Sequence, residues 1–176
     1  ESRILEIKES FTNDFKVKNP NEEIPVEINI PFILAHGLSH ALIRELSITC
    51  GYSTSSIKER IYSDENGKEM CGILIYTSSS DSDGTLGGLS RIAEEDRFTE
   101  IFINSIKNIE FCSSDPICST NKSSLKDDFI LSSCNSCLLL PETSCEYFNY
   151  YLDRLLLVNR NQNDKPGFFN GLLEIE

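Results

Sequence analysis

The sequence is poor in basic residues. It holds 16 Lys and Arg against 28 Asp and Glu, so its formal net charge is −12 and its pI is near 4.6. Phosphate contacts need cationic side chains, so this balance excludes tight nucleic-acid binding through the field of the whole chain. Contact with DNA would have to come from a local patch or from a partner.

Long apolar runs and ATPase motifs are also missing. No run approaches the roughly 20 apolar residues that span a bilayer, and nothing resembles a signal peptide, so we expect no membrane partner. The sequence has neither the Gly-Lys-Ser/Thr of a P-loop nor a DEAD/DEAH-type box. We therefore expect no ATP hydrolysis by this chain alone.

The seven cysteines are an odd number for a chain of 176 residues. A secreted disulfide scaffold is typically shorter and has an even count, so we expect a cytoplasmic protein with reduced thiols. The length predicts a single domain over 1–176, with its core at about 30–160. Cys50 and Cys71 are predicted to pack as small apolar side chains. Because the chain begins at Glu1 rather than at Met, we expect it to be part of a longer protein.

The other five cysteines gather in one polar segment, as Cys112-x5-Cys118 followed by Cys134-x2-Cys137-x7-Cys145. A C-x-x-C pair turns the backbone so that two thiolates can face one ion, and Zn²⁺ accepts four such ligands in a tetrahedron. Few apolar residues lie nearby, so a metal would supply folding energy that a core cannot. The spacing predicts a structural zinc knuckle. We expect Cys134, Cys137 and Cys145 as ligands, and the spacing leaves Cys118 and Cys112 both open as the fourth.

Two segments predict the centre of an α+β fold. Apolar residues at helical spacing follow Pro31 and stop at Gly51, which predicts a central buried helix over Phe32–Thr49. Alternating residues on either side of the Asp64–Gly67 turn predict a β-hairpin at about 57–76.

The sequence also predicts strands before the central helix and further helices after the hairpin. Partial alternation in Ile4–Ile7 and Val26–Ile30 predicts N-terminal strands that join the hairpin in a small antiparallel sheet, packed on helices. We expect further helices over Leu89–Asn108 and Cys145–Asn159, the latter carrying Asp153-Arg154 as a solvated ion pair. The zinc knuckle would occupy about 112–145.

Two further motifs could carry chemistry. His36 and His40 are four residues apart on the expected central helix, a spacing that can bind a metal, but Gly37 stands where the zincin motif has its Glu. We favour buried histidines that hydrogen-bond to backbone or to an acid. Asp81-Ser-Asp83-Gly-Thr matches the nucleophile motif of haloacid-dehalogenase-type phosphatases, but it does not follow a strand directly and no βαβ pattern surrounds it, so we favour a turn.

Several motifs occur in one order: His36-Gly-Leu-Ser-His40, the loop from Asp81 to Leu89, the two cysteine groups, and Leu152-Asp-Arg154. In this combination, from about Ile30 to Val158, the chain resembles the MrfA-associated zinc-binding domain family. The resemblance implies that zinc is held by the cysteines, here Cys112, Cys118, Cys134, Cys137 and Cys145. It also implies a domain joined to a superfamily 2 DNA helicase, or working beside one, in some members in antiphage defence. The insert 119–133 is longer than in compact members and leaves the fourth ligand open.

Two functional hypotheses follow. The favoured one is a non-catalytic, zinc-stabilised accessory domain of a helicase-associated antiphage defence protein, which docks on a DNA helicase in the same chain or in another subunit and engages DNA through that complex. The alternative is a metal- or Asp-dependent hydrolase, a phosphatase or nuclease, that uses His36, His40, Asp81 and Asp83. An open cleft shared by the histidines and the aspartates would favour the enzyme, whereas buried histidines would favour the accessory domain.

Overall fold

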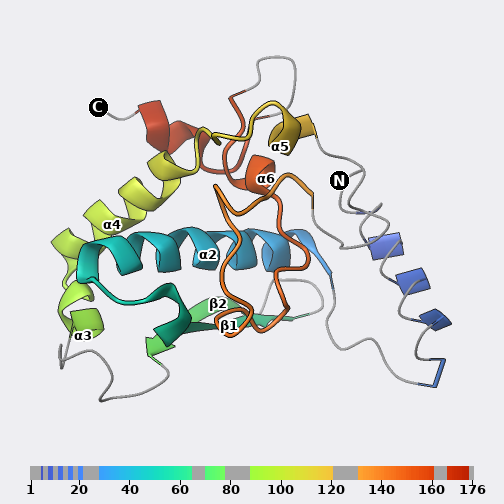
Figure 1. Cartoon of the computed structure of the whole chain (residues 1–176), viewed down its shortest axis with the longest axis horizontal. Helices are drawn as coiled ribbons and strands as arrows, with labels where there is room; N and C mark the ends of the chain where they lie inside the picture. Colours follow the sequence, from blue (N-terminus) through green and yellow to red (C-terminus); the bar gives the residue numbers. More distant parts are fainter. Residues whose placement is uncertain are drawn as a thin grey trace.

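The structure is a computed structural model of the chain. It describes residues 28–64, 70–77, 88–120, 131–160 and 166–174, with isolated positions between residues 5 and 21. Its elements in chain order are α2 (Ile30–Cys50), the 3-10 helix η1 (Thr54–Ser56), β1 (Ile57–Ser63), β2 (Cys71–Thr77), α3 (Gly88–Ile92), α4 (Glu95–Asn108), α5 (Ile117–Thr120), α6 (Arg154–Leu157) and the 3-10 helix η3 (Asn170–Glu174) (Figure 1). In this part of the chain, no helix combines the length and apolar character that a membrane crossing requires.

Helix α2 is the centre of the fold. The side chain of Asn29 accepts the backbone N–H of Phe32 (2.8 Å), Pro31 lies in the first turn, and Gly51 ends the helix in the left-handed region at φ 72°. In Figure 1 the hairpin packs below α2, and α4 and α6 pack above it. The predicted central helix is confirmed, because its start and stop signals are local.

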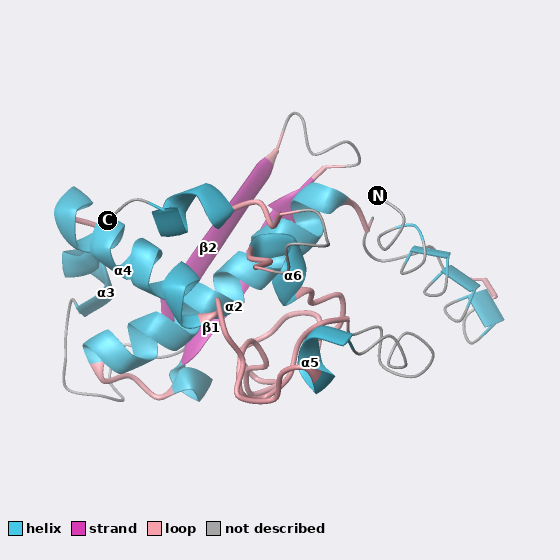
Figure 2. Ribbon diagram, turned by 90° about the horizontal axis from the view of Figure 1, so that it is seen from above, coloured by secondary structure: helices cyan, strands magenta, loops and turns pink. Residues whose placement is uncertain are grey.

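The two strands form the predicted antiparallel hairpin, in which Ile57 pairs with Thr77 and Ser63 pairs with Cys71. Figure 2 shows the strands running beneath α2. Side chains alternate along β1, so Ile57, Glu59 and Ile61 share the buried face. An acidic residue is thereby carried into the core between two isoleucines.

The predicted N-terminal strands are not found in the described part of the chain. Of the first segment only Leu5, which is helical, is described, and of the second Val26 and Glu27 lie outside the described residues. Within the second segment, Ile28 and Asn29 form no strand. The sheet of the described residues therefore has two strands, β1 and β2.

The predicted helix over Leu89–Asn108 is divided into α3 and α4. Ala93 donates its N–H to the carbonyl of Ser90 (3.3 Å), which closes a turn after α3. Glu94 is extended, with φ −64° and ψ 130°, and begins α4 as its N-cap. Helix α4 buries Ile101 and Ile106.

The predicted last helix over Cys145–Asn159 is wrong apart from the short α6. Phe148, Asn149 and Tyr151 have φ values of 53°, 64° and 63°, which a right-handed helix excludes. Tertiary hydrogen bonds replace the helical ones, because the side chain of Asn149 bonds both the N–H and the carbonyl of Leu140 at 2.9 Å. This irregular chain turns Cys145 toward α2.

Candidate metal centres

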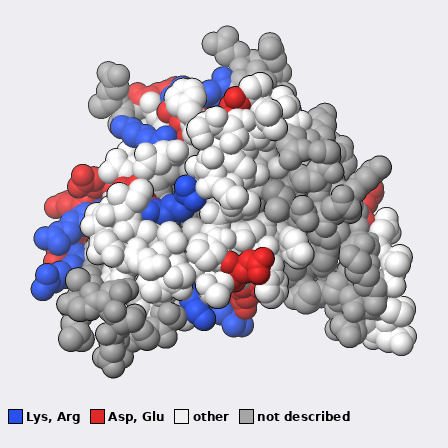
Figure 3. Space-filling model, viewed as in Figure 1, with Lys and Arg blue, Asp and Glu red and all other residues white. Residues whose placement is uncertain are grey.

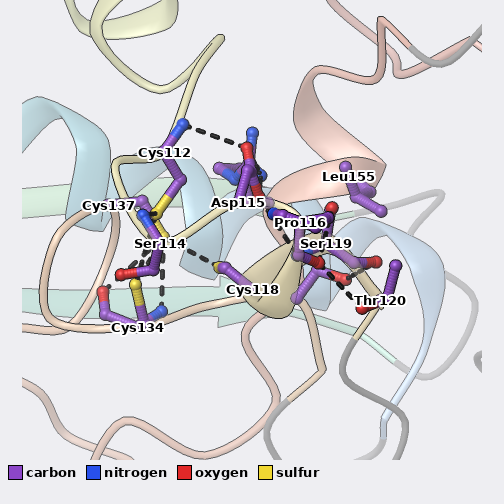
Figure 4. A network of polar contacts seen from close by, with 12 residues as sticks. Cys112, Ser114, Asp115, Pro116, Cys118, Ser119, Thr120, Cys134, Cys137 and Leu155 are labelled. Atoms are coloured by element: carbon purple, nitrogen blue, oxygen red, sulfur yellow. Dashed lines mark hydrogen bonds and ion pairs between the residues drawn. The ribbon is translucent and has the colours of Figure 1, made fainter.

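Four of the clustered cysteines meet in space. Cys112 follows α4, Cys118 lies in α5, and Cys134 and Cys137 lie in the loop that begins at residue 131 (Figure 4). The Sγ–Sγ distances are 3.3 Å for Cys112–Cys134, 3.7 Å for Cys118–Cys137 and 3.8 Å for Cys134–Cys137. All four sulfur atoms lie within 4.8 Å of one another, and none is in a disulfide. The first metal centre is defined by these four residues.

Backbone hydrogen bonds shape the turn around the C-x-x-C pair. The carbonyl of Cys134 accepts the N–H groups of Cys137 (3.1 Å) and Leu138 (3.0 Å). The N–H of Cys134 donates to the Sγ of Cys137 (3.2 Å), and the N–H of Ser114 donates to the Sγ of Cys112 (3.4 Å). Bonds of this kind stabilise thiolates and orient them before an ion binds.

The four sulfur atoms fit a zinc ion. A tetrahedron with Zn–S bonds of 2.3 Å has S–S edges of about 3.8 Å, close to the observed separations. Burial and then the charge of the neighbouring thiolates raise the pKa of Cys118, and burial raises the pKa of Cys137 to about 12. Burial opposes ionisation of Cys134 too, but hydrogen bonds from Cys112 and Ser114 lower its pKa to about 6. Four thiolates at this spacing require a cation, and Zn²⁺ suits the all-sulfur donor set.

A buried arginine supports this cluster from α6. Nη2 of Arg154 lies 2.8 Å from both carboxylate oxygens of Asp115, and Nη1 donates to the carbonyls of Ile109 (3.2 Å) and Glu110 (3.1 Å). Asp115 in turn accepts the N–H of Cys112 (3.1 Å). The Arg154 side chain is 2% exposed, so the predicted solvated pair of Asp153 and Arg154 is wrong. The guanidinium instead ties α6 to the segment that carries Cys112.

Helix α2 holds the other side of the knuckle. Nη1 of Arg44 donates to the carbonyls of Asn135 (3.2 Å) and Leu139 (3.1 Å), and Nη2 donates to that of Ser136 (3.2 Å). One planar cation thus caps three carbonyls of the loop, an arrangement that suits the fixed fork of arginine.

The fifth cysteine of the segment lies in a different cluster. The structure separates Cys145 from Cys134 and Cys137 and places it beside His36, His40 and Glu59. Sγ of Cys145 lies 3.2 Å from Nε2 of His36, so the three cysteines that we expected to share an ion do not meet.

The second cluster is fully inside the molecule. Nε2 of His36 lies 3.1 Å from Oε1 of Glu59 and 3.2 Å from Sγ of Cys145, and Nε2 of His40 lies 3.2 Å from the same Oε1. Both histidines are 0% exposed. Burial lowers the pKa of His36; burial opposes ionisation of Glu59, but hydrogen bonds from the two histidines hold the pKa of this carboxyl below its usual range. Burial and the charge of Glu59 raise the pKa of Cys145.

This burial bears on the two hypotheses for the histidines. Both histidines are buried, as the favoured interpretation expected: Nδ1 of His40 lies 2.9 Å from the carbonyl of Leu138, and its Nε2 lies 3.2 Å from Oε1 of Glu59. The motif residues Asp81 and Asp83 lie outside the described residues. The histidines are closed off from solvent rather than aligned along an open cleft.

Sequence reasoning missed Glu59 as a site residue. The signal was present, because an acidic residue stands at an inward position of a strand between Ile57 and Ile61. A glutamate in such a position is almost never buried without a partner, so the alternation alone predicts a cationic or metal partner for Glu59.

Comparison with known proteins places these residues in a family context. Residues 38–138 match the model of a family described as MrfA Zn-binding domain. Over 157 residues the chain is 38% identical to the DISARM protein DrmB of Bacillus paralicheniformis (strain ATCC 9945a / NCIMB 11709 / CD-2), an alignment that covers 89% of this chain and 28% of the relative. The chain thus spans less than a third of the length of that protein. These matches confirm the resemblance that the motifs indicated.

We predict that Arg154→Met weakens the first centre. The change removes the cation that binds Asp115 and leaves two buried carbonyls without a donor, so unfolding in urea should cost about 1.5–3 kcal/mol less than in the parent chain. Zinc transfer to a chromophoric chelator should also be faster. Arg160→Met is the matched control, because Arg160 is 40% exposed and pairs with the carboxylate of Glu110 rather than with Asp115. Equal stabilities and equal transfer rates for the two variants would contradict the prediction.

Proposed function

The chain belongs to the MrfA Zn-binding domain family, and from this premise we propose that it is a non-catalytic accessory domain stabilised by a structural zinc ion. The four-cysteine cluster carries the proposal, and we assign Cys112, Cys118, Cys134 and Cys137 as the ligands. Structural zinc sites are closed by four protein ligands, whereas catalytic ones keep a position for water or substrate. A four-thiolate site supplies no such open position.

We assign the domain to antiphage defence. The support is the 38% identity to a DISARM protein over most of this chain. Because the chain spans 28% of that relative, the domain would serve a larger assembly rather than act alone. The seven cysteines form no disulfide, which supports the expected cytoplasmic location. Each of the three buried clusters includes residues of α2, which supports a single domain for the described part of the chain.

Docking on a DNA helicase is the role that the surface supports best. An apolar groove of about 770 Å³ opens between α2, β2, α4 and the segment at Phe168, and Leu74 (47% exposed), Phe98 and Phe168 line it with their side chains partly in solvent. Apolar surface of this kind is typical of protein interfaces. A protein partner with an apolar segment would fit it.

Direct DNA binding by this chain has less support. Its net charge is −12, and Figure 3 shows acidic and basic side chains interspersed on one face, without a continuous basic surface among the described residues there. We propose that DNA is engaged through the helicase complex. The buried histidines weigh against the alternative of a hydrolase, because a substrate could not reach them without opening the core.

Replacing a cysteine of the first centre tests its assignment. We expect Cys137→Ser to lose one equivalent of zinc and to destabilise the chain by several kcal/mol, because zinc binding is part of the folding free energy in such units. Metal content by elemental analysis and thermal melting measure both effects. Cys71→Ser is the matched control, since Cys71 is exposed and remote from the cluster. If the two variants keep the same zinc content and melt alike, the assignment is wrong.

The proposal predicts that the isolated chain binds DNA only weakly. We expect the isolated chain to bind a fluorescently labelled 20-base-pair duplex at physiological salt with a Kd of about 10 μM or weaker, in the range of non-specific binding. Fluorescence anisotropy measures this affinity. A submicromolar Kd would overturn the proposal that DNA is engaged only through a partner.

Helicase docking can be tested at the groove. We expect Leu74→Glu to reduce co-purification with the superfamily 2 helicase of the same defence system by at least about tenfold, because a charge desolvated in an apolar interface costs more than 1.4 kcal/mol. Phe111→Glu is the matched control, since Phe111 is 73% exposed and lies outside the groove. Equal recovery of helicase with both variants would move docking to another surface.

A further inference from the structure

We propose that His36, His40, Glu59 and Cys145 bind a second zinc ion, separate from the four-cysteine site. Each residue offers one ligand atom, and the four atoms lie within 4.8 Å of one another. They come from α2, from β1 and from the irregular segment after residue 141, so the ion would join three parts of the chain that are distant in sequence. This site goes beyond the zinc knuckle on which the proposed function depends.

The distances match the edges of a metal tetrahedron. With Zn–N and Zn–O bonds near 2.0–2.1 Å and Zn–S near 2.3 Å, the N–O and N–S edges are about 3.3 and 3.6 Å. The observed values are 3.1 Å for His36–Glu59, 3.2 Å for His40–Glu59 and 3.2 Å for His36–Cys145. The observed edges are shorter than the ideal ones by about 0.1–0.4 Å.

The tautomer of His40 turns a lone pair toward this centre. Its Nδ1 lies 2.9 Å from the carbonyl of Leu138, which only accepts hydrogen bonds, so the proton of a neutral ring is on Nδ1. Nε2 then presents a lone pair to Oε1 of Glu59, another acceptor, at 3.2 Å. A hydrogen bond between them would require a second proton on the His40 ring, whereas a metal ion between the two acceptors binds the neutral ring. A backbone carbonyl on the far nitrogen is also the usual partner of a metal-bound histidine.

Protons alone satisfy the contacts of His36 poorly. A single hydrogen on Nε2 would have to serve both Oε1 of Glu59 at 3.1 Å and Sγ of Cys145 at 3.2 Å. Among the described residues, Nδ1 of His36 has no hydrogen-bond partner, and its polar contacts are those of Nε2. A metal ion at the centre satisfies Nε2, Oε1 and Sγ at once.

The backbone around Cys145 is arranged to hold a thiolate. Sγ accepts the N–H groups of Tyr147 (3.4 Å) and Asn149 (3.2 Å). The bond from Tyr147, two residues after the cysteine, has a counterpart in the first centre, where the N–H of Ser114 donates to Sγ of Cys112. Left-handed Phe148 and Asn149 aim these N–H groups at the sulfur, and such conformations persist where the surroundings over-determine them. A ligand position explains why this strain is retained.

The charges of the set balance a divalent ion. One carboxylate and one thiolate neutralise Zn²⁺, and two neutral imidazoles complete the shell, so the core holds no net charge. The second carboxylate oxygen of Glu59 is hydrogen-bonded by Ser39, as expected for a ligand whose orientation is fixed. Because no ligand is more than 5% exposed, the site is closed, and we assign it a structural role. The mixed N, O and S donors favour zinc among the divalent metals.

The two centres are linked through one peptide. Leu138, whose carbonyl orients His40, directly follows Cys137 of the first centre. The loop that presents the first ion therefore also sets the ring of a ligand to the second. Loss of either ion should therefore alter the geometry of the other site, although each site has its own ligands.

Metal analysis of the full chain, purified from zinc-supplemented cells without chelators, tests the proposal. We expect two zinc ions per chain and five protected thiols, and a zinc-edge X-ray absorption shell of five sulfur and three nitrogen or oxygen atoms over both sites. The Cys137→Ser chain should retain one ion, with one sulfur and three lighter ligands. One zinc per chain with an all-sulfur shell would overturn the second site and leave the first intact.

Variants separate the two sites. We expect His40→Gln and Cys145→Ser each to reduce the content from two zinc ions to one and to leave an all-sulfur shell. Cys50→Ser, at a half-buried cysteine outside both clusters, should keep both ions. Two ions retained in both ligand variants would overturn the proposal, as would a second ion of another metal. If a ligand variant does not fold, the shell of the unaltered chain still decides the question.

Discussion

Four thiolates packed within 4.8 Å of one another are unstable without a cation, and the C-terminal half of the described chain is built around this constraint. Burial and the charge of neighbouring thiolates oppose ionisation of Cys118 and Cys137, while zinc binding favours it, so folding of the segment and binding of the ion are coupled. Arg44 and Arg154 are placed by the same requirement. Each binds backbone carbonyls beside the cluster.

Helix α2 connects this metal-held part to the rest of the fold. One face packs on the hairpin, another on α4, and its polar positions reach into the segment after residue 131. His36 and His40 lie on the buried side with Glu59 from β1, where an unpaired charge would be costly. The polar centre of the core thus joins helix, hairpin and loop, and a second ion there would make all three depend on metal.

The closed character of both centres fits an accessory role. In the proposed assignments, ligands that are all protein atoms and nearly all buried leave a metal no position for a substrate, which supports a structural role for both sites. Function then resides on the surface, where an acidic chain exposes an apolar groove. A groove of that kind suits a protein partner better than a polyanion, which agrees with a domain that works inside a larger defence assembly.

The sequence alone determined the features that depend on residues close together in the chain. Pro31 and Gly51 set the ends of α2, and the hairpin followed from its turn. The cysteine spacing predicted a zinc knuckle, and the combined motifs indicated the family. Only the tertiary structure decided which ligands share an ion. Cys145 and Glu59 are distant along the chain from the residues that they meet, and their spacing carries no information about that meeting. Local backbone geometry is encoded locally, whereas the membership of a metal site depends on how remote segments pack.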